Sequence, residues 1–127
     1  MPEHGISPVY DSSSRILILG SFPSVASREE GFFYAYPRNR FWKVISYLTG
    51  STEPDGIEKK KELLLSSRIA LWDVIASCTL KGSSDSSIKN VKANDIRPLL
   101  EGSGIIQVFT NGKKAHELYM KIGRAHV

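Results

Sequence analysis

The amino-acid sequence predicts one domain of the α/β class, built on a parallel sheet. Three apolar runs of strand length, at residues 15–20, 69–75 and 105–109, are continuous rather than alternating, which is typical of strands buried on both faces. Segments with helical features separate these runs, and this alternation predicts right-handed crossovers between parallel strands. With 127 residues, of which 41% are hydrophobic, the chain can fill one core but not two.

Four segments have the apolar periodicity or the capping residues of helices. They are residues 40–49, 57–66, 94–100 and 113–121. In the third of these, Asn94 or Asp95 can cap the helix, and Pro98 then falls in the first turn, where a missing N–H is tolerated.

The connection after the first strand is the first place where we expect function. Residues 21–27 are polar and contain Pro23, so we expect a loop, and the aromatic residues 32–37 follow before the next helix. Loops that leave the carboxyl ends of parallel strands are where open α/β sheets bind ligands. A second polar loop is predicted at residues 81–87.

Composition and charge narrow the classes of function. Seventeen Lys and Arg against thirteen Asp and Glu give a net charge of +4, which fits a polyanion partner without requiring one. Cys78 is the one cysteine, so no internal disulfide is expected, and no zinc-site spacing is present. The N-terminus lacks the features of a signal peptide, and no apolar run approaches the roughly 18 residues of a membrane span. We therefore expect a metal-free, soluble, cytoplasmic protein.

The last six residues differ in character from the rest. Residues 122–127 are what a widely used sequencing adaptor gives when translated in one frame. We therefore expect a single domain over residues 1–121, incomplete at its C-terminus, followed by a non-native tail.

Five separated motifs carry a resemblance to a known family. They are GSFPS at residues 20–24, YAYPRNRFW at 34–42, ALWDVI at 70–75, GSSDSSI at 82–88 and NGK at 111–113. In this order they resemble the uracil-DNA glycosylase superfamily, most closely its hypoxanthine (deoxyinosine) branch, over nearly all of residues 7–121. The resemblance implies a three-layer α/β/α sandwich with a short parallel sheet, whose fourth strand we expect to be missing here. It also implies an enzyme of base excision repair that flips a deaminated base from duplex DNA and hydrolyses its N-glycosidic bond without metal or cofactor.

The resemblance and the chemistry of the side chains together suggest site residues. Glycosidic cleavage builds positive charge on the sugar and negative charge on the base, so a water must be held and the base anion stabilised. Asn39 matches the family's catalytic asparagine, and its amide carbonyl can hold the water. The candidates for binding the base are Phe22, Tyr36, Asp73 and Asn111. The candidates for binding DNA phosphates are Ser21, Ser24, Ser27 and Lys113.

Each candidate also has a purely structural interpretation. Asn39 can cap the helix that begins at Arg40, Asp73 can close its strand, and Asn111 can belong to an ordinary Asn-Gly turn. The aromatic rings can simply close the core. Tyr36 stands where close relatives commonly carry His, which removes a group able to protonate a leaving base near neutral pH.

We therefore expect a monofunctional DNA-deoxyinosine glycosylase that acts as a monomer on double-stranded DNA, and whose activity the missing C-terminal segment can abolish in this incomplete form. Uracil is the alternative base. A flavodoxin-like nucleotide-binding module is an alternative from another class, although residues 20–24 lack the glycines of a phosphate-binding loop. A third alternative is a catalytically inactive fragment that binds DNA weakly through its basic surface.

Overall fold

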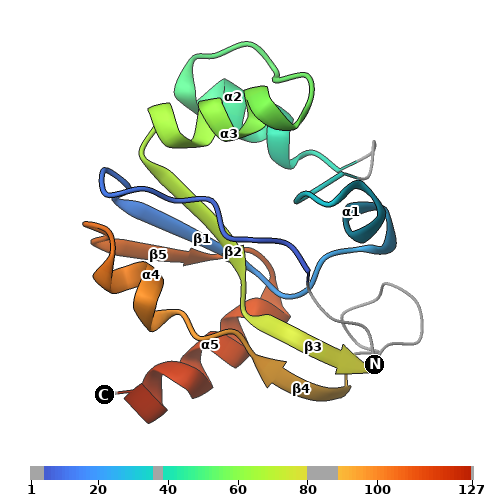
Figure 1. The fold of residues 1–127 in the computed structure, drawn as a ribbon, viewed down its shortest axis with the longest axis vertical. Helices are drawn as coiled ribbons and strands as arrows, with labels where there is room; N and C mark the ends of the chain where they lie inside the picture. The colour runs from blue at the N-terminus through green and yellow to red at the C-terminus, as the bar shows by residue number, and fades with distance from the viewer. Residues whose placement is uncertain (1–4, 36–38, 80–88, 127) are drawn as a thin grey trace.

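The computed structural model describes residues 5–35, 39–79 and 89–126, and their strands form two sheets (Figure 1). The strands are β1 (Ile16–Gly20), β2 (Ile69–Asp73), β3 (Ile75–Thr79), β4 (Lys89–Ala93) and β5 (Gln107–Thr110). The three-stranded sheet has the order β2-β1-β5, with β1 parallel to both neighbours. The parallel sheet that the apolar runs predict is therefore confirmed.

Helices cover both faces of the parallel sheet. They are α1 (Val25–Glu30), α2 (Phe41–Thr49), α3 (Ile57–Ser66), α4 (Arg97–Glu101) and α5 (Lys113–His126). Helices α2 and α3 lie on one side of the sheet, and α4 and α5 lie on the other (Figure 1). This is the three-layer α/β/α arrangement expected from the family resemblance. Among the described residues, no helix combines the length and apolar character needed to cross a membrane.

The central strand β1 divides the core into two clusters, because successive side chains of a strand point to opposite faces. Leu17 and Leu19 are fully buried among residues of β2, α4 and α5. Ile18 packs on the other side, against a cluster that includes Trp42 of α2 and Leu64 of α3. The continuous apolar run of β1 is thus explained by helices on both of its faces.

The connection after β1 contains a helix that the sequence did not lead us to expect. The Ser24 hydroxyl accepts a hydrogen bond from the Ser27 amide at 3.1 Å and so caps α1. Gly31, at φ 80°, ends the helix in the left-handed conformation that glycine adopts readily. The prediction that residues 21–27 form only a loop is therefore wrong, because Ser24 supplies an N-cap directly before the helical turn.

The predicted strand over residues 69–75 is two strands. β2 ends at Asp73, and the chain then starts β3 at Ile75, which pairs in antiparallel fashion with β4. β4 was not predicted, because residues 89–93 include one large apolar residue, Val91, and two lysines. The predicted polar loop at residues 81–87 lies outside the described residues.

The other predicted helices and the third strand are confirmed, with small shifts of their ends. The Asp95 carboxylate accepts a hydrogen bond from the Arg97 amide at 3.2 Å and so satisfies the first N–H of the short helix α4, whose N-cap residue is Ile96. β5 begins at Gln107, two residues later than the apolar run suggested. Helix α5 continues through residue 126, past the predicted end at 121.

Candidate active site

The carboxyl ends of the three parallel strands meet at one edge of the sheet. Gly20 ends β1 and pairs in register with Asp73, which ends β2. On the other side of β1, Leu19 pairs with Thr110, so that Asn111 follows directly at the end of β5. The crossover topology therefore brings together residues that lie more than 90 positions apart in the sequence.

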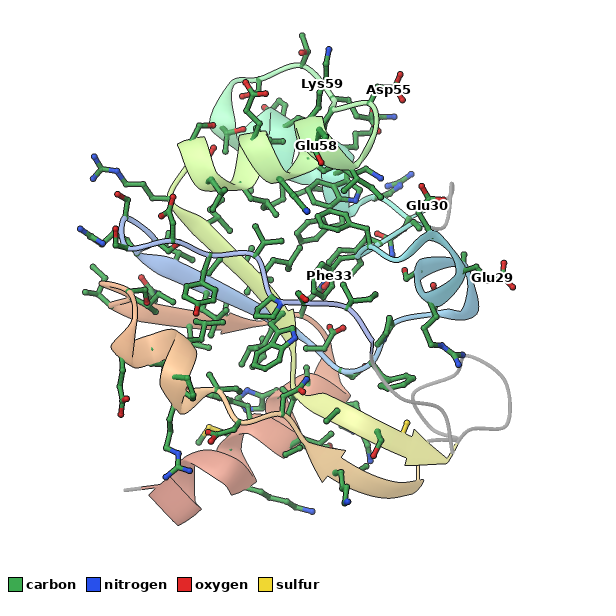
Figure 2. All side chains as sticks on the ribbon, viewed as in Figure 1. Glu29, Glu30, Phe33, Asp55, Glu58 and Lys59 are labelled. Atoms are coloured by element: carbon green, nitrogen blue, oxygen red, sulfur yellow. The ribbon has the colours of Figure 1, made fainter. Side chains whose placement is uncertain are left out.

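A cavity of about 230 Å³ opens at this edge. Its lining combines the strand ends with the segments on either side of α1: Gly20, Ser21, Phe22, Pro23, Ser24, Ser27, Phe33, Tyr34, Asn39, Asp73 and Asn111. Pockets for drug-sized ligands typically measure about 300–1,000 Å³, so this cavity suits a smaller guest, of the size of a single base. The Phe33 side chain points inward, whereas Glu29 and Glu30 of α1 point away from the sheet (Figure 2).

Seven of the nine predicted site residues line this cavity. They are Ser21, Phe22, Ser24, Ser27, Asn39, Asp73 and Asn111. Lys113 is not part of the lining; it begins α5, and its ammonium lies 4.0 Å from the Glu117 carboxylate. Tyr36 lies outside the described residues.

The Asp73 carboxylate lies over Gly20 at the floor of the cavity. Asp73 is 3% exposed, and its backbone carbonyl accepts a hydrogen bond from the Asn94 side chain at 2.9 Å. A Cβ atom on Gly20 would overlap the Asp73 carboxylate and would lie 3.0 Å from the Tyr34 hydroxyl. Glycine at position 20 is therefore what leaves room for the buried carboxylate in the cavity.

Asn39 lies between the start of α2 and the cavity, so both interpretations of it can be examined in the structure. Its Oδ1 accepts a hydrogen bond from the Phe41 amide at 2.8 Å, so Asn39 satisfies the first N–H of α2. The predicted position differs by one residue, because α2 begins at Phe41 and its N-cap residue is Arg40. Asn39 is also exposed and lines the cavity. An amide oxygen has two lone pairs, so the capping bond leaves one for a water molecule.

Tyr34 is the residue of the site whose contact the sequence did not suggest. Its hydroxyl accepts a hydrogen bond from Asn111 Nδ2 at 2.9 Å, and its ring stacks on Phe41 with centroids 4.0 Å apart. Tyr34 and Asn111 lie 77 positions apart, and no sequence pattern signals that they meet. The sequence suggested Phe22 and Tyr36 as aromatic candidates for binding the base, but it did not suggest a hydrogen bond between Tyr34 and a strand end.

The serine hydroxyls near the cavity hold the loop together. Ser27 Oγ accepts hydrogen bonds from the Ala35 amide at 3.2 Å and from the Ser24 hydroxyl at 3.1 Å, and Ser27 is 2% exposed. Ser21 is also buried. Phosphate binding by these serines stays a prediction, and in this conformation the burial of Ser27 leaves its hydroxyl little access to a phosphate.

Two further side chains beside the cavity bear on its chemistry. The Arg28 guanidinium lies 5.4 Å from the centroid of the Phe22 ring, so a cation covers one face of that ring. Cys78 is fully buried, and burial raises the pKa of its thiol, an effect that the Arg28 charge partly opposes. A protonated, buried thiol is a poor nucleophile. The described residues contain no group of three His, Cys, Asp or Glu side chains placed to hold a metal ion.

Comparisons with known proteins agree with this geometry. The profile of the uracil DNA glycosylase superfamily matches residues 7–127. A hypoxanthine DNA glycosylase of Methanosarcina acetivorans is 37% identical over 119 residues, covering 92% of this chain and 75% of its own. A hypoxanthine DNA glycosylase of Methanosarcina barkeri is 33% identical over 127 residues, covering 98% of this chain and 80% of its own.

The fold has a match among solved structures. The solution NMR structure of a candidate uracil DNA glycosylase from Methanosarcina acetivorans superimposes with a TM-score of 0.85 at 35% sequence identity. The match covers 99% of this chain and 79% of that protein. The similarity therefore extends over the whole arrangement of strands and helices that builds the cavity.

Proposed function

Because this chain belongs to the uracil DNA glycosylase superfamily, we propose that it is a DNA glycosylase that removes hypoxanthine from DNA in the cavity at the carboxyl edge of its sheet. The names of its relatives in the two Methanosarcina species support hypoxanthine as the base. The observation that carries the proposal is the pairing of a buried carboxylate, Asp73, with an amide, Asn111, in one base-sized cavity.

This pair of side chains suits the edge of a deaminated purine. Deamination of adenine to hypoxanthine turns N1 from an acceptor into an N1–H donor, and it replaces the 6-amino donor with the O6 acceptor. An ionised carboxylate can only accept hydrogen bonds, so Asp73 complements N1–H, while the Asn111 amide can donate to O6. Adenine presents the reverse pattern, and burying it here would leave polar groups unpaired.

Uracil is the second candidate base. Its N3–H and O4 present the same donor and acceptor as N1–H and O6 of hypoxanthine, so Asp73 and Asn111 alone do not separate the two bases. The difference lies in size, because a purine has two rings and a pyrimidine one. The superfamily as a whole carries the name of uracil, so the test compares both bases.

The remaining lining residues complete a route to hydrolysis. Asn39 Oδ1 holds the water that attacks C1′ of the sugar, and Phe22 stacks on the flipped base. The water oxygen bonds to C1′ as the N-glycosidic bond breaks, with its electron pair leaving on the base. Asn111 stabilises this developing anion, and the proton released by the water ends on the base or in solvent. The products are the free base and an abasic site.

We propose that the protein acts as a monomer, because one copy supplies every residue named in the cavity. The net charge of +4 favours approach to duplex DNA. We place DNA phosphates near Ser21, Ser24 and Lys113. No lysine lines the described cavity, so the site lacks the amine with which lyase-type glycosylases form a Schiff base.

A single-turnover assay tests the proposal on duplexes that carry one deoxyinosine or one deoxyuridine. We expect release of hypoxanthine, faster than of uracil, leaving an alkali-labile abasic site and no adduct trapped by borohydride. Asp73→Asn should lower hypoxanthine release by about a hundredfold, because the amide replaces one of the two acceptor oxygens of the carboxylate with an NH2 donor. The control Asp55→Asn changes an exposed carboxylate outside this cavity and should excise at the wild-type rate.

Two outcomes would count against this proposal. If the wild-type chain releases neither base and its cavity binds neither free base, the proposed function is wrong. If Asp73→Asn excises hypoxanthine as fast as the wild type, the activity stands but Asp73 does not read the base edge.

A further inference from the structure

We propose that Tyr34 is a positioning residue, which fixes the orientation of the Asn111 amide and so confines the cavity to deaminated bases. This inference rests on the proposed function, because it assigns to Asn111 the role of donor to the base. Tyr34 need not touch the base for this role, since it acts through the side chain of Asn111.

The first step is the contact itself. Asn111 is exposed at the end of β5, and its Nδ2 donates to the Tyr34 hydroxyl at 2.9 Å. An asparagine side chain can rotate by 180° and exchange its donor for its acceptor, and its hydrogen bonds decide which orientation is stable. In the described structure, the bond to Tyr34 is the one that sets this orientation.

The second step is that Tyr34 is itself firmly held. Its ring stacks on Phe41, the first residue of α2, with centroids 4.0 Å apart and an interplanar angle of 22°. Its backbone has φ 53°, a left-handed conformation that is rare for a bulky aromatic residue. Such conformations persist where the surrounding structure requires them, and they cluster at functional sites. Here the unusual backbone accompanies a ring that delivers its hydroxyl to the floor of the cavity.

The third step is the polarity of the hydroxyl. The Tyr34 oxygen lies 3.0 Å from the point that a Cβ atom on Gly20 would occupy, and the Asp73 carboxylate overlaps the same point. A nearby carboxylate favours the orientation in which the hydroxyl proton faces it. The lone pairs of the hydroxyl then face Asn111, so this oxygen serves as the acceptor. Turning the amide over would bring Asn111 Oδ1 against these lone pairs, without a proton between the two oxygens.

The consequence for selectivity follows from the second N–H of the Asn111 amide. With one N–H held by Tyr34, the other is available to the base, where it matches O6 of hypoxanthine and opposes the 6-amino group of adenine. Without the hydroxyl, the amide can turn over and offer its oxygen to that amino group. Tyr34 therefore excludes the normal base by preventing a rotation of its neighbour.

The test compares Tyr34→Phe, which removes only the hydroxyl, with Tyr47→Phe, which removes a hydroxyl from an 85% exposed tyrosine on α2. The first measurement is NMR of the Asn111 side-chain amide in the free protein. We expect Tyr34→Phe to shift the two Nδ2–H resonances and Tyr47→Phe to leave them unchanged. Unchanged resonances in Tyr34→Phe would overturn the inference at its first step.

The second measurement is the ratio of affinities for free hypoxanthine and free adenine, obtained by titration. We expect Tyr34→Phe to reduce the preference for hypoxanthine by about tenfold, which corresponds to the loss of one hydrogen-bond constraint. A merely structural role would weaken both bases equally and leave the ratio unchanged. An unchanged ratio would therefore contradict the inference, even if both affinities fall.

The third measurement is a double-mutant cycle in the single-turnover assay with a deoxyinosine duplex. Because Tyr34 acts through Asn111, the double variant Tyr34→Phe/Asn111→Ala should be no slower than Asn111→Ala alone. Effects that multiply would show that Tyr34 acts independently of Asn111. If the wild type excises nothing, the proposed function fails, and the resonances and the affinity ratio still decide the role of Tyr34.

Discussion

The two edges of the parallel sheet contain the same unusual features and use them differently. At the carboxyl edge, Tyr34 has a left-handed backbone, Gly20 is crowded by a charged side chain, and Asp73 is a buried polar residue. At the amino edge, Arg68 has φ 60°, Gly104 is crowded by the Arg15 guanidinium, and Ser14 is fully buried. A left-handed residue, a crowded glycine and a buried polar side chain therefore do not by themselves show which edge is the binding site.

The two edges differ in what surrounds the crowded glycine: protein groups at the amino edge, and a cavity at the carboxyl edge. At the amino edge, Arg15 covers Gly104 and donates to the carbonyls of Ser12 and Ser14 at 3.1 and 3.0 Å. The Ser14 hydroxyl accepts from the Asp11 amide at 3.0 Å. The protein thus satisfies its own polar groups there. At the carboxyl edge the corresponding groups surround a cavity, so strain and buried polarity indicate a binding site only where they leave room for a guest.

The largest expected effect comes from two side chains that each accept a hydrogen bond from the first amide of a helix. Asn39 does so for α2 beside the cavity, and Asp95 does so for α4 away from it. Either change to alanine should lower the free energy of unfolding by about 0.5–2 kcal/mol, measured by urea titration. Asn39→Ala should also reduce single-turnover excision of hypoxanthine by about 10²–10³-fold, because the attacking water loses its acceptor.

Asp95→Ala serves as the matched control and should excise at the wild-type rate. If Asn39→Ala loses only stability, as Asp95→Ala does, then Asn39 is a cap and the catalytic role is wrong.

A smaller effect is expected from the two crowded glycines. Gly20→Ala and Gly104→Ala should each destabilise the fold by about 1–3 kcal/mol, because a neighbouring charged side chain must move. Gly20→Ala should in addition slow excision by roughly ten- to a hundredfold, since it displaces the Asp73 carboxylate from the cavity floor.

The rates of excision are compared at matched fractions of folded protein. Equal rates for the two glycine variants would contradict the claim that only the carboxyl edge carries the activity. A larger loss of rate in Gly104→Ala than in Gly20→Ala would indicate the amino edge instead.

The sequence predicted where the parallel strands lie, but it did not predict which side chains meet at the carboxyl edge of the sheet. Continuous apolar runs located β1, β2 and β5, and the polar residues that follow such runs are expected at one edge of a parallel sheet. The run at residues 69–75 nevertheless predicted Asp73 inside a strand, whereas β2 ends at Asp73. Asp73 and Asn111 were candidates because the family resemblance and their side-chain chemistry suggested them. Asn39 was a catalytic candidate only because it matches a family motif. Its position just before α2 predicts equally well the hydrogen bond that it accepts from the Phe41 amide.

The missed features depend on information that is not local in the sequence. The bond between Tyr34 and Asn111 depends on the crossover that brings β5 beside β1, and the crowding of Gly20 depends on the register with Asp73. The ribbon of β3 and β4 was missed because β4 is stabilised by pairing with β3 rather than by an apolar pattern of its own. Helix α1 was missed for a different reason: Ser24 and the six residues of the helix do carry a capping signal, but Pro23 made the segment resemble a loop.

The central claim is that the carboxyl edge of the sheet binds a deaminated base, and titration of ¹⁵N-labelled protein with free hypoxanthine tests it directly. We expect the backbone amides of Gly20, Ser21 and Asn111 to shift on addition of hypoxanthine, while those of Ser14, Arg15 and Gly104 at the amino edge stay in place. Adenine at the same concentration should cause smaller shifts, since its edge opposes Asp73 and Asn111. Shifts centred on the amino edge, or equal shifts with both bases, would contradict the account.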